Sequence, residues 1–306
     1  MVYNSLIDAP RNLKEGIDWL IALKGTNAAK SLTAMGAAIH KFLADKPAGF
    51  TEVPALEKIK SISKKFLEQD GMKYEWCVER LLGRFKEPMK KQPSLFDKWF
   101  GIIAESDYEN VVQKHGVDTG AMTANLTQVV DNCEKFLGGI KDADQYKSAY
   151  SSEATWEASC AKNPEACAVV LVGVAPILYT GLRSLWAATE SATKRWPPYY
   201  AKQRLANILQ ASGYVEPEFY GSVSGSDLLN VFKGMDVEIF TTLYDFAGYW
   251  AFYGERSAGA VGPAKSAAPE QPAAAEQSSG ADEPEGGAAE GDESEEGEES
   301  EEADEQ

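Results

Sequence analysis

The sequence contains few of the residues that build metal sites or disulfide-rich scaffolds. Among its 306 residues are four cysteines and two histidines. Cys77, Cys133, Cys160 and Cys167 lack the paired spacing of zinc ligands, and four cysteines are too few to staple a chain of this length. We therefore expect no metal and no other cofactor, and a fold that depends on a hydrophobic core.

Only Cys160 and Cys167 lie close enough in the sequence to be considered as a disulfide. In one continuous helix their positions would be roughly 10 Å apart along the axis, which is too far to bridge. Asn163–Pro164 interrupts such a helix, so a small loop closed by a disulfide can form. Two reduced, buried thiols are the alternative, and the sequence alone favours it.

The usual sequence motifs of catalysis are missing. The chain has no phosphate-binding loop, no dinucleotide-binding glycine pattern, no H-E-x-x-H pair and no G-x-S-x-G nucleophile elbow. His40 lies beside Ile39 at the edge of a predicted helix, and His115 is expected at a helix end. The carboxylates of Asp131 and Glu134 fall on exposed helical turns. We expect the protein not to be an enzyme and to have no small-molecule substrate.

The chain also lacks a basic region. Its formal net charge is −17, but residues 258–306 hold 16 acidic residues against the single Lys265. Residues 1–257 then carry 29 basic and 31 acidic residues, a net charge of −2. No run of Lys and Arg exceeds two residues, which argues against a nucleic-acid partner, because such proteins need a basic surface to neutralise phosphates.

Long hydrophobic runs are scarce. The N-terminus carries early charges and has no apolar segment of the signal-peptide kind, so we expect no conventional signal peptide. The longest uncharged stretch is Ala166–Leu182, which contains Gly173 and Pro176 and ends at Arg183. Its 17 residues are at the lower limit for crossing a bilayer, so a buried core helix is predicted in place of a transmembrane helix.

What the sequence does contain is helical periodicity. From residue 12 to residue 254, apolar residues recur at three- and four-residue steps without sustained alternation, which predicts an all-α, multi-helix fold. Residues 1–254 are predicted to form the globular region, with 141–164 as the candidate place for a subdivision. Residues 255–306, rich in Ala, Gly and Glu, are predicted to be a disordered acidic tail. The predicted helices cover residues 12–25, 26–46, 54–67, 74–85, 95–104, 107–114, 122–140, 165–190, 199–211 and 237–253.

Three local patterns give finer predictions. Asn12 followed by Glu15 predicts a capped helix start, and Thr26 is predicted to cap the second helix. Aromatic residues crowd 237–253, where we expect an internal core and not a groove for a partner. The lysines of the third helix are expected to face largely outward, as a solvated face; they are Lys58, Lys60, Lys64 and Lys65.

Several separated stretches resemble one known family. The stretches together span about residues 4–254, and they are Asn12–Gly25, Phe42–Leu56, Leu81–Met89, Tyr146–Cys167, Gly181–Trp186 and Thr242–Tyr253. In them the chain resembles the variant erythrocyte surface antigens of Babesia-type piroplasm parasites. Larger members of that family continue into a Cys/Lys-rich region, a coiled coil and a membrane anchor, and this chain looks like a short member without them.

The resemblance implies a role in antigenic variation and in adhesion of infected erythrocytes. It implies a member of a multigene family that is exported to, or associated with, the infected erythrocyte, with a host cell-surface protein or another antigen subunit as partner. No binding residue is implied by the resemblance. The alternative function is an intracellular helical scaffold whose acidic tail binds basic partners by long-range electrostatic attraction.

Overall fold

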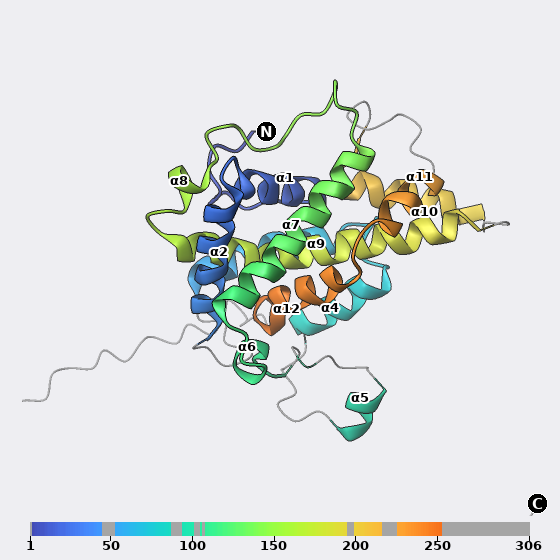
Figure 1. Ribbon diagram of the computed structural model, residues 1–306. Coiled ribbons are helices and arrows are strands. Elements are labelled where there is room, and N and C mark those ends of the chain that lie inside the picture. Colours follow the sequence, from blue (N-terminus) through green and yellow to red (C-terminus); the bar gives the residue numbers. More distant parts are fainter. Residues whose placement is uncertain are drawn as a thin grey trace, which may run out of the picture. The chain divides into compact units, whose positions relative to one another are not determined.

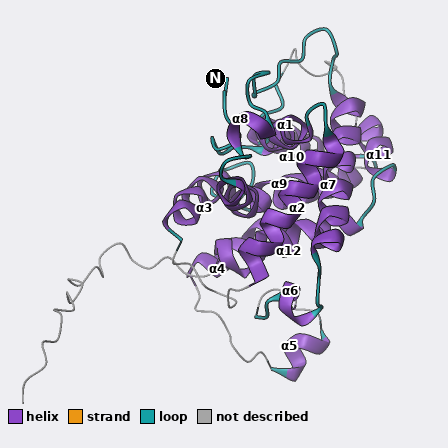
Figure 2. Ribbon diagram, turned by 60° about the vertical axis from the view of Figure 1, so that its left-hand side comes forward, coloured by secondary structure: helices purple, strands orange, loops and turns teal. Residues whose placement is uncertain are grey.

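The structure, a computed structural model, describes residues 2–44, 53–86, 94–100, 105, 108–194, 199–215 and 225–252. In these ranges every regular element is a helix and no strand occurs, so the predicted all-α class is confirmed (Figure 2). All the described residues belong to one compact unit of the chain. The predicted disordered tail, 255–306, lies outside the described residues and stays a prediction.

Twelve helices occur in the described part of the chain (Figure 1). They are α1 (Leu13–Lys24), α2 (Ala28–Ala44), α3 (Pro54–Leu67), α4 (Trp76–Lys86), α5 (Leu95–Trp99), α6 (Val111–Lys114), α7 (Thr119–Ile140), α8 (Trp156–Ser159), α9 (Pro164–Ala192), α10 (Tyr199–Ala211), α11 (Gly225–Lys233) and α12 (Glu238–Phe252).

Helix α9 is the centre of the compact unit. It packs against α1, α2, α3, α4, α10, α11 and α12 (Figure 1). It is long and apolar enough to cross a membrane by length and composition, but 89% of its most apolar window is buried by the other helices. The structure thus places the segment where the sequence predicted it, in the core of the helical array.

A proline and a glycine shape the contact between α9 and α3. Pro176 has no N–H and so cannot bond the carbonyl of Val172, which loosens this turn of α9. The hydroxyl of Ser63 donates to the adjacent Gly173 carbonyl at 2.5 Å. A Cβ atom at Gly173 would lie 2.4 Å from Cγ2 of Ile59, so only glycine allows this approach. The loosened turn is therefore stabilised from α3.

The helix termini follow the sequence closely, with one correction. Asn12 accepts the Glu15 N–H at 2.9 Å, and α1 ends before Gly25 at φ 53°, as the pattern predicts. The predicted cap at Thr26 is wrong: the side chain of Asn27, one residue later, accepts the N–H of Lys30. Thr and Asn both act as N-caps, and the distance in sequence to the first apolar residue of α2 does not distinguish Thr26 from its neighbour Asn27.

The third helix needs a second correction. Lys58 and Lys65 are exposed as predicted and Lys64 is half-buried, but Lys60 is only 2% exposed. Its Nζ lies 3.2 Å from Oε1 of Glu57, one turn earlier. The long aliphatic stem lies along apolar surface while the amine reaches a carboxylate, so a lysine can occupy an inward position.

Two short helices differ most from their predicted bounds, and one helix was not predicted. Helix α6 begins at Val111 and not at Asp107, because the Asn110 side chain caps it by accepting the N–H groups of Val112 and Gln113. Helix α5 ends at Trp99, and residues 101–104 of the longer prediction lie outside the described residues. Helix α11 was not predicted from the periodicity.

The segment between α7 and α9 packs against the N-terminal part of the chain. The N–H of Tyr3 donates to the carbonyl of Ala149 at 2.8 Å, and the Tyr3 and Tyr150 rings stack with centroids 4.9 Å apart. Asp18 of α1 accepts the N–H of Ala149, also at 2.8 Å. The candidate subdivision at 141–164 therefore falls on a segment that is tied to α1.

Candidate binding groove

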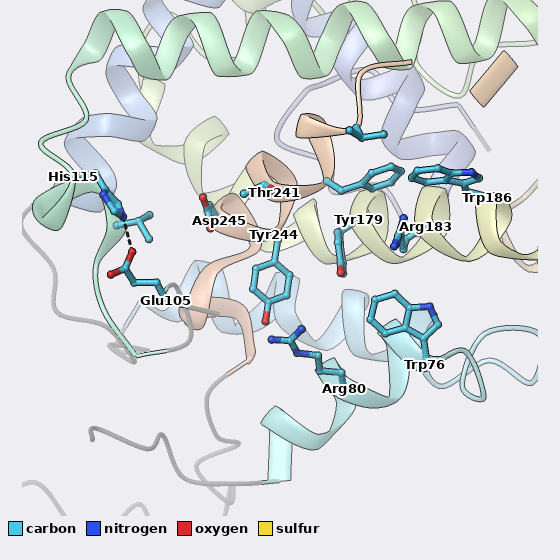
Figure 3. A pocket seen from close by; sticks show the side chains of 13 residues that line it. Trp76, Arg80, Glu105, His115, Tyr179, Arg183, Trp186, Thr241, Tyr244 and Asp245 are labelled. Atoms are coloured by element: carbon cyan, nitrogen blue, oxygen red, sulfur yellow. Dashed lines mark hydrogen bonds and ion pairs between the residues drawn. The ribbon is translucent and has the colours of Figure 1, made fainter. Parts of the chain in front are cut away.

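An open groove of about 640 Å³ lies between α4, α9 and α12 (Figure 3). The helical period explains how three separate segments line it. Trp76 and Arg80 are four residues apart on α4, Tyr179 and Arg183 are four apart on α9, and Phe240 and Tyr244 are four apart on α12. Residues at this spacing share one face of a helix, so each helix presents one aromatic and polar stripe to the groove.

One end of the groove is built around Arg183. Its guanidinium carbon lies 4.8 Å from the ring centroid of Trp186, 5.4 Å from that of Phe240 and 5.5 Å from that of Trp76. Trp186 and Phe240 also stack on each other with centroids 5.3 Å apart. Each cation–π contact contributes about 0.5–2 kcal/mol, so the rings hold the arginine side chain in a defined orientation.

The middle of the groove repeats the pairing of arginine with aromatic rings. The guanidinium carbon of Arg80 lies 5.3 Å from the ring centroid of Tyr244, and Tyr244 meets Tyr179 edge to face at 5.2 Å. Figure 3 shows Arg80 and Trp76 facing α9 from below, with Tyr179 and Arg183 pointing toward them. The groove therefore combines two cations with a nearly continuous aromatic wall.

The other end of the groove is acidic and ion-paired. Glu105 accepts a hydrogen bond from Lys114, and its Oε2 lies 2.6 Å from Nε2 of His115. The hydrogen bond from Lys114 is the first cause of the lowered pKa of Glu105, so this carboxylate stays ionised. His115 directly follows the last residue of α6, as the sequence predicted. Asp245 of α12 lies at the same end (Figure 3).

The sequence-predicted site residues, Cys160 and Cys167, lie elsewhere. The structure joins them in a disulfide with Sγ atoms 2.11 Å apart and Cα atoms 5.8 Å apart. Helix α8 ends before Cys160, and α9 begins at Pro164 with Asn163 as its cap, so the break in the helix brings the two cysteines together. Of the two alternatives that the sequence left open, the structure has the disulfide and not the favoured pair of thiols.

Cys77 and Cys133 are free, and we predict that neither reacts in the folded protein. Burial raises the pKa of the Cys77 thiol to about 11 and that of Cys133 to about 12, so little of either thiolate, the reactive form, exists at pH 8. Titration with an aromatic disulfide reagent should give no fast-reacting thiol in the native protein, two in denaturant, and four after reduction. Four in denaturant without a reductant would contradict the Cys160–Cys167 disulfide.

The remaining polar candidates lie outside the groove. Asp131 and Glu134 of α7 both bind Nζ of Lys24 on α1, at 2.9 and 2.6 Å, so they form an ion pair between helices. His40 is half-buried on α2. Within the ranges that the structure describes, no three His, Cys, Asp or Glu side chains gather in a group that could hold a metal ion.

A second apolar surface lies on and beside α5. Leu95, Phe96, Trp99 and Phe100 are all exposed, and the rings of Phe96 and Phe100 stack with centroids 6.1 Å apart. Contiguous exposed apolar side chains of this kind are typical of surfaces that meet a partner.

The groove was not predicted from the sequence. The aromatic residues of 237–253 were expected in the core, and Phe240, Tyr244 and Phe246 are indeed buried, yet the first two also form one wall of the groove. One signal could have pointed to it: Arg183 is a lone charge at the end of the longest uncharged stretch. An arginine in a core helix needs a compensating environment, and the rings provide it.

Comparison of the chain with protein-family models, with curated protein sequences and with solved structures gives no match.

Proposed function

We propose that this protein is a non-enzymatic binding protein of the variant erythrocyte surface antigen type, which acts in antigenic variation and in adhesion of infected erythrocytes. Its partner would be a host cell-surface protein or another antigen subunit, and the protein would be exported to the infected erythrocyte. The family part of this proposal rests on the six stretches that resemble those antigens. The binding part rests on the groove.

The observation that supports binding best is the composition of the groove. Trp, Tyr and Arg are the residues most enriched among those that dominate the energy of protein–protein interfaces, and the groove gathers them from three helices. Trp76 is 48% exposed in the groove, while Phe240 and Tyr244 are buried in its wall. An exposed aromatic side chain beside a preformed wall is suited to bury itself against a partner at little cost in conformational entropy.

The adhesion proposal predicts a strong effect of Trp76→Ala. Purified full-length protein should bind cultured endothelial cells, and the substitution should weaken this binding about 10- to 30-fold, the loss of a central interface aromatic. Tyr199→Ala is the control, because it removes an exposed aromatic side chain of α10 outside the groove and should leave adhesion unchanged. Equal adhesion of the wild-type and Trp76→Ala proteins would remove the groove from the proposal.

Location is tested separately. Antibody labelling of intact infected erythrocytes, with and without surface protease, should give a signal that the protease removes. A signal confined to the parasite body would favour the alternative of an intracellular scaffold. That alternative also predicts that deleting Ala258–Gln306 abolishes capture of basic proteins at low salt, because this segment carries nearly all of the net charge.

A further inference from the structure

The side chain of Arg183 has a feature that its aromatic contacts do not explain. Among the described residues it is the donor of no hydrogen bond and the partner of no ion pair, although a guanidinium carries five N–H donors in a planar fork. The rings of Trp76, Trp186 and Phe240 contact the arginine through their π systems, which accept little from N–H groups in the guanidinium plane. The hydrogen-bonding edge of Arg183 is therefore available at the groove.

Another arginine of this protein has a carboxylate partner within the chain. Arg204 of α10 donates through Nε and Nη2 to the two carboxylate oxygens of Glu75, at 2.7 and 2.5 Å. Glu75 directly precedes α4, whose first residue, Trp76, contacts Arg183. Two partly buried arginines thus lie near one helix start, and only one of them has a carboxylate. Among the described residues, the donors of Arg204 thus have a carboxylate and those of Arg183 do not, so Arg183 is suited to bind a carboxylate at the groove.

We propose that Arg183 binds a carboxylate side chain of a partner polypeptide, with an adjacent apolar side chain of that partner packed on Trp76 and Phe240. This inference rests on the proposed binding function and specifies the chemistry of the same groove. A planar guanidinium held between rings matches a carboxylate in two parallel hydrogen bonds and loses little entropy on binding it. At about 640 Å³ the groove is larger than a single acidic side chain requires, so several residues of a chain can lie in it.

The charges along the groove set the direction of the bound segment. Arg80 of α4 and Arg183 of α9 line the middle and one end of the groove. Glu105 and Asp245 lie at the other end (Figure 3). A partner segment that carries its acidic residue at the Arg183 end avoids the two carboxylates. Glu105 already pairs with Lys114 and lies beside His115, so the donors at that end have a carboxylate, whereas those of Arg183 have none among the described residues.

The test is selection of peptides on the full-length protein. A phage-displayed library of random 12-residue peptides is selected on the wild type and, in parallel, on Arg183→Gln. Wild-type selection should enrich Asp or Glu next to an aromatic or aliphatic residue, and Arg183→Gln should not. Synthetic versions of the enriched peptides should bind Arg183→Gln at least 10-fold more weakly by fluorescence anisotropy, and should lose as much when their Glu is replaced by Gln.

Two further variants make the result specific. Arg183→Lys keeps the charge but loses the planar fork, so its affinity should lie between those of the wild type and Arg183→Gln. Lys202→Gln removes an exposed cation of α10 outside the groove and should bind as the wild type does. Circular dichroism and the Tm of each variant check that the fold is retained, so that a loss of binding is assigned to the groove.

Three outcomes would overturn the inference. They are selection of no peptide, selection of peptides without an acidic preference, and equal binding to the wild type and Arg183→Gln. Displacement of the peptides by free glutamate as readily as by the peptides themselves would make the groove a small-molecule carboxylate site, which also contradicts a polypeptide partner. Failure of the proposed adhesion function gives a different result. Binding of the peptides would then still require Arg183, while Trp76→Ala would adhere to endothelial cells as the wild type does.

Discussion

Replacing Trp19 by alanine is expected to lower the free energy of unfolding by about 3–5 kcal/mol, the usual cost of truncating a large buried aromatic side chain. Trp19 on α1 is 0% exposed, and its Nε1–H donates to the carbonyl of Leu6 at 2.8 Å. The substitution opens a cavity and also removes the donor from a buried carbonyl. The indole of Trp19 connects α1 with the segment that precedes it. Urea unfolding followed by far-ultraviolet circular dichroism measures the change in the free energy of unfolding.

Trp99→Ala provides the matched comparison for this prediction. Trp99 is 85% exposed on α5, so the same substitution there should change the free energy of unfolding by no more than about 0.5 kcal/mol. Similar losses for the two variants would contradict the assigned core. A loss below about 1 kcal/mol for Trp19→Ala would do so as well, because it would mean that the indole is not enclosed.

The helices themselves could be predicted because the signals that define them are local. Asn12 and Gly25 bound α1, Pro54 begins α3, and Asn163–Pro164 begins α9, each through an effect on its own few residues. The core position of α9 also follows from its sequence, because an uncharged segment of that length must be covered. The helical periodicity therefore predicted the fold class and the apolar face of each predicted helix.

The contacts between helices could not be predicted in this way. Periodicity states which face of a helix is apolar, but not which other helix covers it. Arg183 and Trp76 are more than a hundred positions apart, and nothing in either segment indicates that they meet. Lys60 is a similar case, because a charged residue type predicts exposure until the packing of α3 on α9 is known. A binding site formed between helices therefore follows only from the three-dimensional arrangement.

A second buried position combines packing with electrostatics. Asp18 on α1 is 1% exposed, and it accepts hydrogen bonds from the hydroxyl of Tyr146 and, at 2.8 Å, from the N–H of Ala149. Nζ of Lys14, one turn earlier, lies 3.6 Å from its Oδ2. One carboxylate thus gathers three donors from α1 and from the segment after α7. This arrangement ties the segment to the core.

Asp18→Ala is expected to lower the free energy of unfolding by about 3–5 kcal/mol at pH 7. Removing one partner of a buried ion pair leaves the Lys14 amine without its carboxylate, and the donors of Tyr146 and Ala149 lose their acceptor. Asp131→Ala is the control, because the Asp131 carboxylate is half-exposed and its ion pair with Lys24 should be worth at most about 1 kcal/mol. If chemical denaturation gave equal losses of unfolding free energy for Asp18→Ala and Asp131→Ala, burial of Asp18 would add nothing to the stability of the fold.

The pH dependence of stability gives an independent measure of the same burial. Desolvation is the first cause of the raised pKa of Asp18, and the hydrogen bonds from Tyr146 and Ala149 oppose it only in part. The folded chain therefore keeps this proton to higher pH than the unfolded chain. The contribution of Asp18 to stability is full below the ordinary pKa of 3.8, falls as the pH rises through the raised value, and is constant above it. Asp18→Asn cannot titrate, so the stability difference between wild type and this variant should shrink over that interval. A difference that grows with pH would mean that the hydrogen bonds outweigh desolvation at this carboxylate.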